Sequence, residues 1–184
     1  MLKSILHRLV RRMERDMDYD ASYAHEVVDA NPLAALKFSF VASMVPRRDA
    51  PAAALAAAAF VGTLNEDCGP CTQIGVEYAA RAGVQPVVVR AILAGDEAAM
   101  GEDAALAYRF ARASLARDLL AADREREEVV RRWGRKGMVA LALSLTAARM
   151  YPTLKYAMGH GRACSRVMVA GSPAPFQAPL AEAA

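Results

Sequence analysis

Apolar residues recur at helical spacing along almost the whole chain, and no segment of any length shows the strict alternation of a half-buried β-strand. Near the N-terminus, Leu2, Leu6 and Leu9 fall on one face of a helix. Proline and glycine separate one such segment from the next. The pattern predicts an all-α fold, and several segments that are apolar all round predict helices buried between neighbours or between subunits.

Shifts in composition divide the predicted helices into three regions. Residues 1–49 are an N-terminal helical arm, residues 50–170 are the main domain, and residues 171–184 are an extended tail with three prolines. The proline-bounded segment 46–51 is the linker between the first two. The expected helices occupy residues 1–17, 22–29, 32–44, 51–64, 68–81, 85–93, 102–117, 118–134 and 136–150. Pro152 should kink or end the last of them.

Bulk properties restrict the possible partners. Lys and Arg number 23 against 20 Asp and Glu, and a net charge of +3 is too small to indicate a nucleic-acid surface. No stretch of about 18 residues is free of charge, so no membrane span is expected. The cationic N-terminal segment lacks the continuous apolar core of a secretory signal. Three cysteines, an odd number, favour a reducing cytoplasmic compartment over a disulfide framework.

The sequence Cys68-Gly69-Pro70-Cys71 is the strongest chemical motif in the chain. Two thiols three residues apart meet across one helical turn, close enough to cycle between dithiol and disulfide. Asp67 is the expected N-cap of the helix that follows. A helix N-terminus favours a thiolate, whereas the adjacent carboxylates of Glu66 and Asp67 oppose it. The motif therefore predicts a redox site, and the balance of these effects stays open.

Two other interpretations of the cysteine pair deserve comparison. Gly-Pro is the dipeptide of the thioredoxin active site, but the segment that leads into it here is an alanine-rich helix instead of a strand. A zinc site is the other: Cys68 and Cys71 could combine with His160 and Cys164 into a tetrahedral Cys₃His set. The second half of that set is weakly spaced, which makes zinc the less favoured interpretation.

A wider pattern around the dithiol resembles a known family. The sequence Asn65-Glu66-Asp67-Cys68 precedes Cys71, and the following helix ends with Tyr78-Ala79-Ala80-Arg81-Ala82-Gly83-Val84, which places Gly83 twelve residues after Cys71. Together with the later helix over 105–111 and the segment 129–158, this is similar to the alkylhydroperoxidase D-like, or carboxymuconolactone decarboxylase, family. The resemblance covers about residues 51–161. It implies an all-helical domain that assembles as a homo-oligomer, as a trimer or a hexamer.

The resemblance also implies a reaction. In family members that reduce peroxides the second cysteine attacks and the first resolves, which would give these roles to Cys71 and Cys68. The substrate would be a small hydroperoxide or a disulfide, and a separate electron donor would restore the dithiol. No organic cofactor and no metal is expected. Glu66 in the preceding turn and Tyr78, two helical turns beyond Cys71, are candidate supporting residues.

The chain departs from the family at two positions. The family's histidine, four residues after the second cysteine, is Gly75 here, and its glutamate, twelve before the first, is Ala56. The histidine would deprotonate the attacking thiol and protonate the departing alkoxide. Without it, the roles of the two cysteines could reverse. The alternative function is a non-catalytic helical assembly protein with structural or redox-sensing cysteines; decarboxylation of a muconolactone-type substrate is a third.

Gly75 also carries a structural expectation. A glycine inside a helix costs about 0.5–1 kcal/mol relative to alanine, so the position needs a reason. The favoured reason is the close approach of a neighbouring helix, and the other is space for a substrate.

Overall fold

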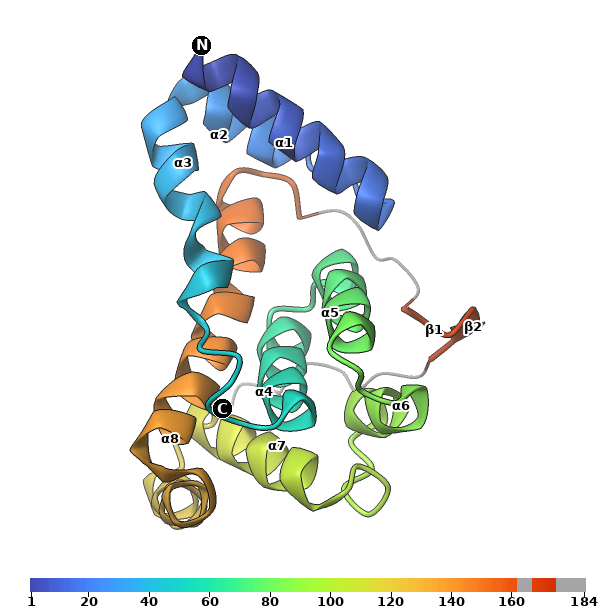
Figure 1. Cartoon of the computed structure of the whole chain (residues 1–184), viewed down its shortest axis with the longest axis vertical. Helices are drawn as coiled ribbons and strands as arrows, with labels where there is room; N and C mark the ends of the chain where they lie inside the picture. The colour runs from blue at the N-terminus through green and yellow to red at the C-terminus, as the bar shows by residue number, and fades with distance from the viewer. Residues whose placement is uncertain (162–166, 175–184) are drawn as a thin grey trace.

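The computed structural model describes residues 1–161 and 167–174, and within them the chain is almost entirely helical (Figure 1). The predicted all-α class is thereby confirmed. The elements are α1 (Leu2–Met17), α2 (Ser22–Ala30), α3 (Pro32–Ser39), the 3₁₀ helix η1 (Val41–Met44), α4 (Ala52–Asn65), α5 (Gly69–Arg81), α6 (Pro86–Ala94), α7 (Glu102–Leu115), α8 (Leu119–Ala157), β1 (Met168–Val169) and β2 (Ser172–Pro173).

Proline and glycine set several helix boundaries, as expected. Pro32 and Pro86 stand at the first position of α3 and α6, where the missing N–H donor costs nothing. Gly95 ends α6 with a left-handed φ of 71°. Gly134, with φ of 68°, interrupts α8 between its charged first half and its apolar second half. The break expected between residues 134 and 136 is therefore confirmed.

Two predicted boundaries are wrong. The single helix expected over 32–44 is interrupted at Phe40, where α3 gives way to η1. Pro152 does not end α8, which continues to Ala157. Proline removes one backbone donor, and the burial of Pro152 shows that packing outweighs this loss. The extra turns carry Lys155 to the dithiol.

Residues 168–173 form a small hairpin, whose second strand lies where the extended tail was expected to begin, at residue 171. Strands β1 and β2 pair antiparallel, with Val169 opposite Ser172. Arg90 on α6 holds the hairpin by donating to the carbonyl oxygen of Val169 at 2.7 Å. Of the tail predicted over 171–184, the part after residue 174 lies outside the described residues.

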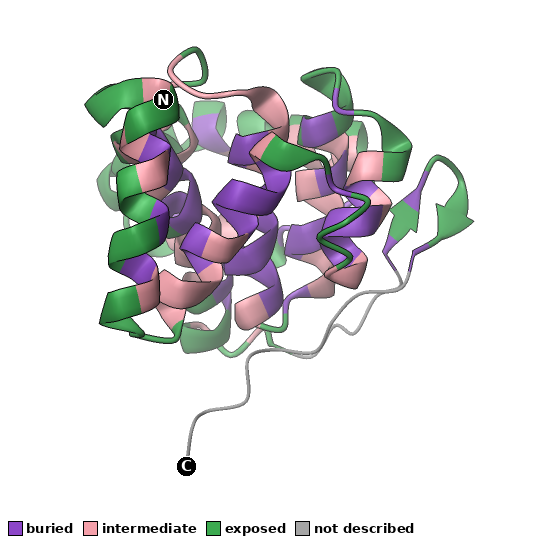
Figure 2. Ribbon diagram, turned by 90° about the horizontal axis from the view of Figure 1, so that it is seen from below, coloured by how far each residue is buried: buried purple, intermediate pink, exposed green. Residues whose placement is uncertain are grey.

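Helix α4 lies at the centre of the core, packed against α5, α7 and α8 (Figures 1 and 2). Its residues are mostly small, which lets the neighbouring helices approach closely. A Cβ atom added at Gly62 would lie 2.9 Å from the carbonyl oxygen of Leu145 on α8. Phe60, 1% exposed, is the largest side chain of α4 in this core. The centre of the molecule is thus a tight contact between α4 and α8.

The apolar second half of α8 is used in that packing. Its buried residues Ala140 and Leu141 belong to the same core as α4. No helix within residues 1–161 and 167–174 combines the length and the hydropathy needed to cross a bilayer.

A histidine pair joins α1 to α2. The rings of His7 and His25 stack with centroids 4.9 Å apart, and their Nδ1 atoms are 2.6 Å apart. The outer ring nitrogens bond Asp29 and Glu14 at 3.1 and 3.2 Å. These two histidines therefore hold two helices of the arm together.

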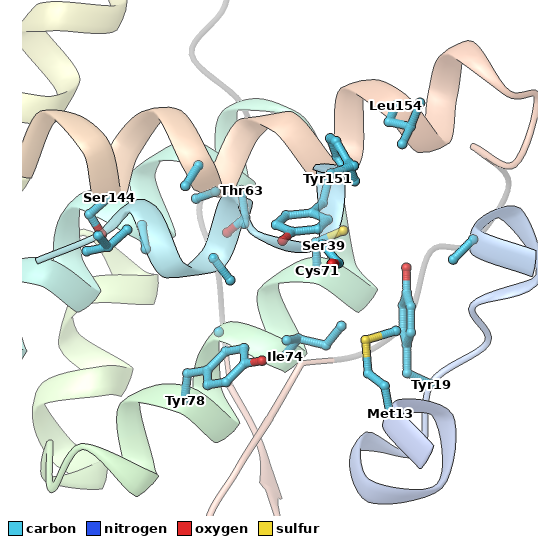
Figure 3. A pocket seen from close by; sticks show the side chains of 18 of the residues that line it. Met13, Tyr19, Ser39, Thr63, Cys71, Ile74, Tyr78, Ser144, Tyr151 and Leu154 are labelled. Carbon is cyan, nitrogen blue, oxygen red and sulfur yellow. The ribbon is translucent and has the colours of Figure 1, made fainter. Parts of the chain in front are cut away.

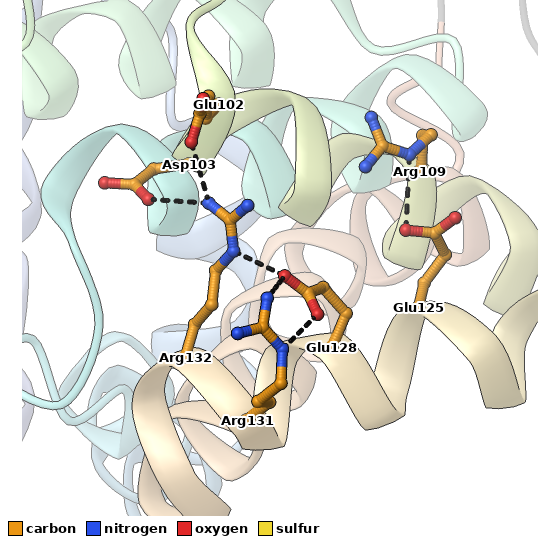
Figure 4. Close-up of polar contacts among 7 residues, drawn as sticks. All are labelled: Glu102, Asp103, Arg109, Glu125, Glu128, Arg131 and Arg132. Atoms are coloured by element: carbon orange, nitrogen blue, oxygen red, sulfur yellow. Dashed lines mark hydrogen bonds and ion pairs between the residues drawn. The ribbon is translucent and has the colours of Figure 1, made fainter.

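Ion pairs connect α7 to the charged half of α8 (Figure 4). Arg132 bonds Glu128 at 2.6 Å and Glu102 at 3.3 Å. The guanidinium groups beside Glu128 lower the pKa of that carboxyl to about 2. Arg109 bonds Glu125, which is only 8% exposed. Within the charged segment 123–128, Glu125 is therefore buried and does not face solvent.

Candidate functional site

The two predicted cysteines lie together at the start of α5. Cys68 is the N-cap residue and Cys71 is the third residue of the helix. Their Sγ atoms are 2.7 Å apart, in a hydrogen bond between thiols and not at the about 2.05 Å of a disulfide. Pro70 fits between them because the second helical position does not need an N–H donor. The local sequence therefore brings the sulfurs face to face.

The helix cap differs from the prediction. Asp67 was expected as the N-cap, but Cys68 takes that position, and its carbonyl oxygen accepts from Thr72 N and Thr72 Oγ1, both at 2.9 Å. Asp67 instead adopts a left-handed turn with φ of 48°. Tyr156 on α8 donates to the carbonyl oxygen of Asp67 at 2.8 Å, which fixes this turn. The tight turn leaves Cys68 as the residue that enters the helix.

The two thiols differ in acidity. The hydrogen bond from Cys71 lowers the pKa of Cys68, against the effect of burial, and the Cys71 backbone N–H and Lys155 lower it further. The same bond and burial raise the pKa of Cys71. Cys68 therefore ionises first, and Cys71 keeps its proton and donates it to the Cys68 thiolate.

An open cavity of about 420 Å³ lies beside the dithiol, between α4, α5, the second half of α8 and the N-terminal helices. Of the two sulfurs it is Cys71 that lines this cavity. Figure 3 shows Cys71 and Tyr78 on α5 facing the same space as Tyr151 on α8 and Tyr19 from the arm. A small molecule in the cavity would thus meet Cys71 first.

The two predicted supporting residues have different positions. Tyr78 lines the cavity, as its spacing from Cys71 suggested. The Glu66 carboxylate does not turn toward the sulfurs, since it bonds Arg149 Nε at 2.6 Å and accepts from Thr153 at 3.4 Å. Its partners lie on α8, so its observed contacts tie the turn before α5 to that helix.

Gly75 and Ala56, the positions of the family's histidine and glutamate, both line the cavity with Cys71. Close packing also occurs at Gly75, because an added Cβ would lie 3.0 Å from Cε1 of Phe60. The glycine therefore leaves room for the Phe60 ring. A side chain at this position would point into the cavity only if that ring moved.

Three residues near the dithiol were missed in the sequence. Lys155 is 6% exposed, and its Nζ lies 5.5 Å from the centroid of the Tyr19 ring. Lys155 lowers the pKa of both thiols, and the neighbouring Tyr19 hydroxyl lowers that of Cys71. Burial raises the pKa of Tyr19 and of Tyr23, so both phenols stay protonated.

These residues gave little sequence signal. Lys155 follows Pro152, where the helix was expected to kink or end. Tyr19 and Tyr23 belong to the arm, which was treated as separate from the main domain. Both tyrosines also line a second cavity, of about 780 Å³, which reaches Lys155 and Pro70. The arm therefore forms one wall of the dithiol site.

The predicted zinc set lies partly within the described residues. His160 bonds Glu26 at 2.9 Å, and Cys164 lies outside the described residues. Among residues 1–161 and 167–174, no group of three or more His, Cys, Asp or Glu side chains could hold a metal ion.

No family model, curated protein or solved structure matches this chain. The function must therefore be argued from the geometry of the site.

Proposed function

We propose that the protein is a thiol–disulfide oxidoreductase in which Cys68 and Cys71 cycle between dithiol and disulfide. The observation that carries the proposal is the position of Cys71, 2.7 Å from its partner sulfur and on the wall of an open cavity. A lowered pKa at Cys68 supplies a thiolate within the pair. A reducing cytoplasm, with a dithiol as electron donor, would suit such a cycle.

We also propose membership of the alkylhydroperoxidase D-like family. Cys71, Gly75 and Ala56 occupy the family's cysteine, histidine and glutamate positions, and all three line one cavity. Assembly as a trimer or hexamer belongs to the same proposal. Exposed apolar side chains support it, among them Phe40 and Leu120, which are 60% and 86% exposed.

The proposed peroxide reaction has two steps. First, the Cys71 proton passes to the Cys68 thiolate, and the Cys71 sulfur attacks the terminal oxygen of the hydroperoxide. The O–O bond breaks, and the alkoxide takes the proton from Cys68 to become an alcohol. Second, the Cys68 thiolate attacks the Cys71 sulfenic acid and releases hydroxide, which solvent protonates. One dithiol and one hydroperoxide thus give one disulfide, one alcohol and one water, and an external dithiol restores the pair.

Lys155 and Tyr19 are proposed to replace the missing histidine. A histidine would stabilise the Cys71 thiolate and supply a proton. Here the Lys155 ammonium favours the thiolate of either cysteine, and the Tyr19 hydroxyl favours that of Cys71. The proton that protonates the alkoxide is already held between the two sulfurs. The chemistry therefore does not require a base at residue 75.

A peroxidase assay on four proteins tests the proposal. Cys164→Ser serves as the parent, so that only the pair can react, and dithiothreitol and cumene hydroperoxide serve as donor and acceptor. Cys71→Ser in this parent should abolish turnover. Cys68→Ser, treated with the hydroperoxide in the absence of dithiothreitol, should leave a sulfenic acid on Cys71 that dimedone traps, because no resolving thiol is present. The protein with the natural sequence should reduce the hydroperoxide at the same rate as the parent. Turnover that survives Cys71→Ser, or a dimedone adduct on Cys68 alone, would contradict the assignment.

One observation favours the alternative, a helical assembly protein with redox-sensing cysteines. Cys68 and Cys71 are only 4% and 8% exposed, and the Phe60 ring occupies the space where the family's histidine would begin. In that case the pair would oxidise slowly and stoichiometrically, without turnover. The oligomeric state, measured by analytical ultracentrifugation, would then change between the dithiol and disulfide forms.

A further inference from the structure

The cavity beside Cys71 is elongated. On α5 its wall consists of residues at helical spacing from Cys71 through Tyr78 to Ala82. The eleven steps from residue 71 to residue 82, at 1.5 Å each, give this wall a length of about 16 Å. Residues from Ala52 to Thr63 on α4 form a second wall of the same length. The cavity is therefore a groove that follows two helices and not a round pocket.

Three hydroxyl groups in the groove already donate to the backbone. Ser39, Thr63 and Ser144 line it, and each hydroxyl donates to a backbone carbonyl oxygen at 2.7 to 3.2 Å. The remaining wall consists mainly of alanine, leucine, valine and aromatic side chains. Such a surface binds an apolar ligand and offers few hydrogen-bonding partners for the polar groups of a ligand.

Arg47 is the exception, because it alone among the described lining residues carries a charge. Its guanidinium carbon lies 5.6 Å from the centroid of the Tyr78 ring. Arg47 is exposed, and within the described part of the chain no carboxylate pairs with it. Tyr78 is seven residues from Cys71, about 10 Å along α5. A cation thus stands beside Tyr78, part-way along the α5 wall of an apolar groove, and a thiol stands at the start of that wall.

We propose that the groove binds an unbranched aliphatic chain that ends in a carboxylate. The carboxylate pairs with Arg47, and the chain runs along α5 past Tyr78 to Cys71. As a substrate, the chain would carry its hydroperoxide about 10 Å from the carboxylate, and that part of the inference rests on the proposed function. Binding of the unoxidised chain does not depend on thiol chemistry.

Calorimetric titration with laurate and with methyl laurate tests the inference. Laurate should bind one site per chain, and the methyl ester should bind about fivefold more weakly because it lacks the charge. Arg47→Gln should weaken laurate by the same factor and leave the ester unchanged. Arg48→Gln, a neighbouring exposed arginine outside the groove lining, is the matched control and should bind laurate like the natural protein.

The thiol chemistry is separated by repeating the titration with Cys68→Ser/Cys71→Ser. If laurate still binds this double variant and the natural protein shows no peroxidase turnover, the proposed function is contradicted and the groove assignment stands. The groove assignment is overturned if laurate does not bind, or if it binds Arg47→Gln and the natural protein equally. It is also overturned if a second copy of the chain covers the groove, seen as laurate binding only to dissociated protein.

Discussion

Replacing Cys71 by alanine should make Cys68 a weaker acid. The Cys68 thiolate owes its stability first to the hydrogen bond from Cys71, across 2.7 Å. A hydrogen bond to a charged group contributes about 1.5–3 kcal/mol, and each pKa unit corresponds to about 1.36 kcal/mol. The substitution should therefore raise the pKa of Cys68 by about 1 to 2. Cys68 is only 4% exposed, so burial also raises its pKa, and in the alanine variant residue 71 no longer donates a hydrogen bond that opposes this effect.

The pKa of Cys68 is measured from the ultraviolet absorbance of its thiolate as a function of pH, and this measurement does not require a reagent to reach the buried sulfur. The parent is again Cys164→Ser, so that Cys68 alone titrates once Cys71 is replaced. Cys71→Ser is the matched control, because its hydroxyl still donates and should keep the Cys68 pKa low. Equal titration midpoints in the alanine and serine variants would refute the role given to the hydrogen bond.

Four other outcomes follow from the same contacts. Lys155→Met should raise the Cys68 pKa and slow its alkylation at neutral pH several-fold, whereas Lys37→Met, an exposed lysine on α3, should change neither. Gly62→Ala should lower the unfolding free energy by about 1–3 kcal/mol in denaturant titrations, because its Cβ meets a backbone carbonyl at 2.9 Å; unchanged stability would mean that α4 and α8 can separate. Gly75→His should increase peroxidase turnover while lowering the melting temperature, and a folded variant without any gain would argue against the family assignment. In Cys71→Ser, the pKa of Cys68 should be lower in the folded protein than in the unfolded chain. The free energy of unfolding, measured by urea titration, should therefore rise with pH between these two pKa values and stay level above the higher one. This pH dependence should disappear in Cys68→Ser/Cys71→Ser.

The spacing of apolar residues, together with the prolines and glycines between segments, predicted most of the helices. The break at Gly134 and the end of α6 at Gly95 follow from glycine's access to positive φ, a property of single residues. Pro152 shows the limit of this reasoning. Its effect on α8 depends on burial against distant segments, which local sequence does not reveal.

The dithiol itself was visible in the sequence, but its surroundings were not. Cys68 and Cys71 are close because they are three residues apart on one helix. Lys155 and Tyr19 reach them from segments more than forty residues away in the chain, so only tertiary packing brings these groups together. The prediction that Asp67 is the N-cap of α5 is wrong for a related reason, because a hydrogen bond from Tyr156 on the distant helix α8 holds that turn.

The reduction potential of the Cys68–Cys71 pair tests the central claim most directly. Cys164→Ser protein is equilibrated with mixtures of reduced and oxidised glutathione, whose potential lies within the expected range, and the loss of two hydrogens is followed by intact-protein mass spectrometry. The account predicts a reversible intramolecular disulfide with a midpoint in the range of about −200 to −300 mV. A pair that stays reduced in every mixture, or that proceeds to sulfinic acid with hydroperoxide and without forming the bond, would contradict it.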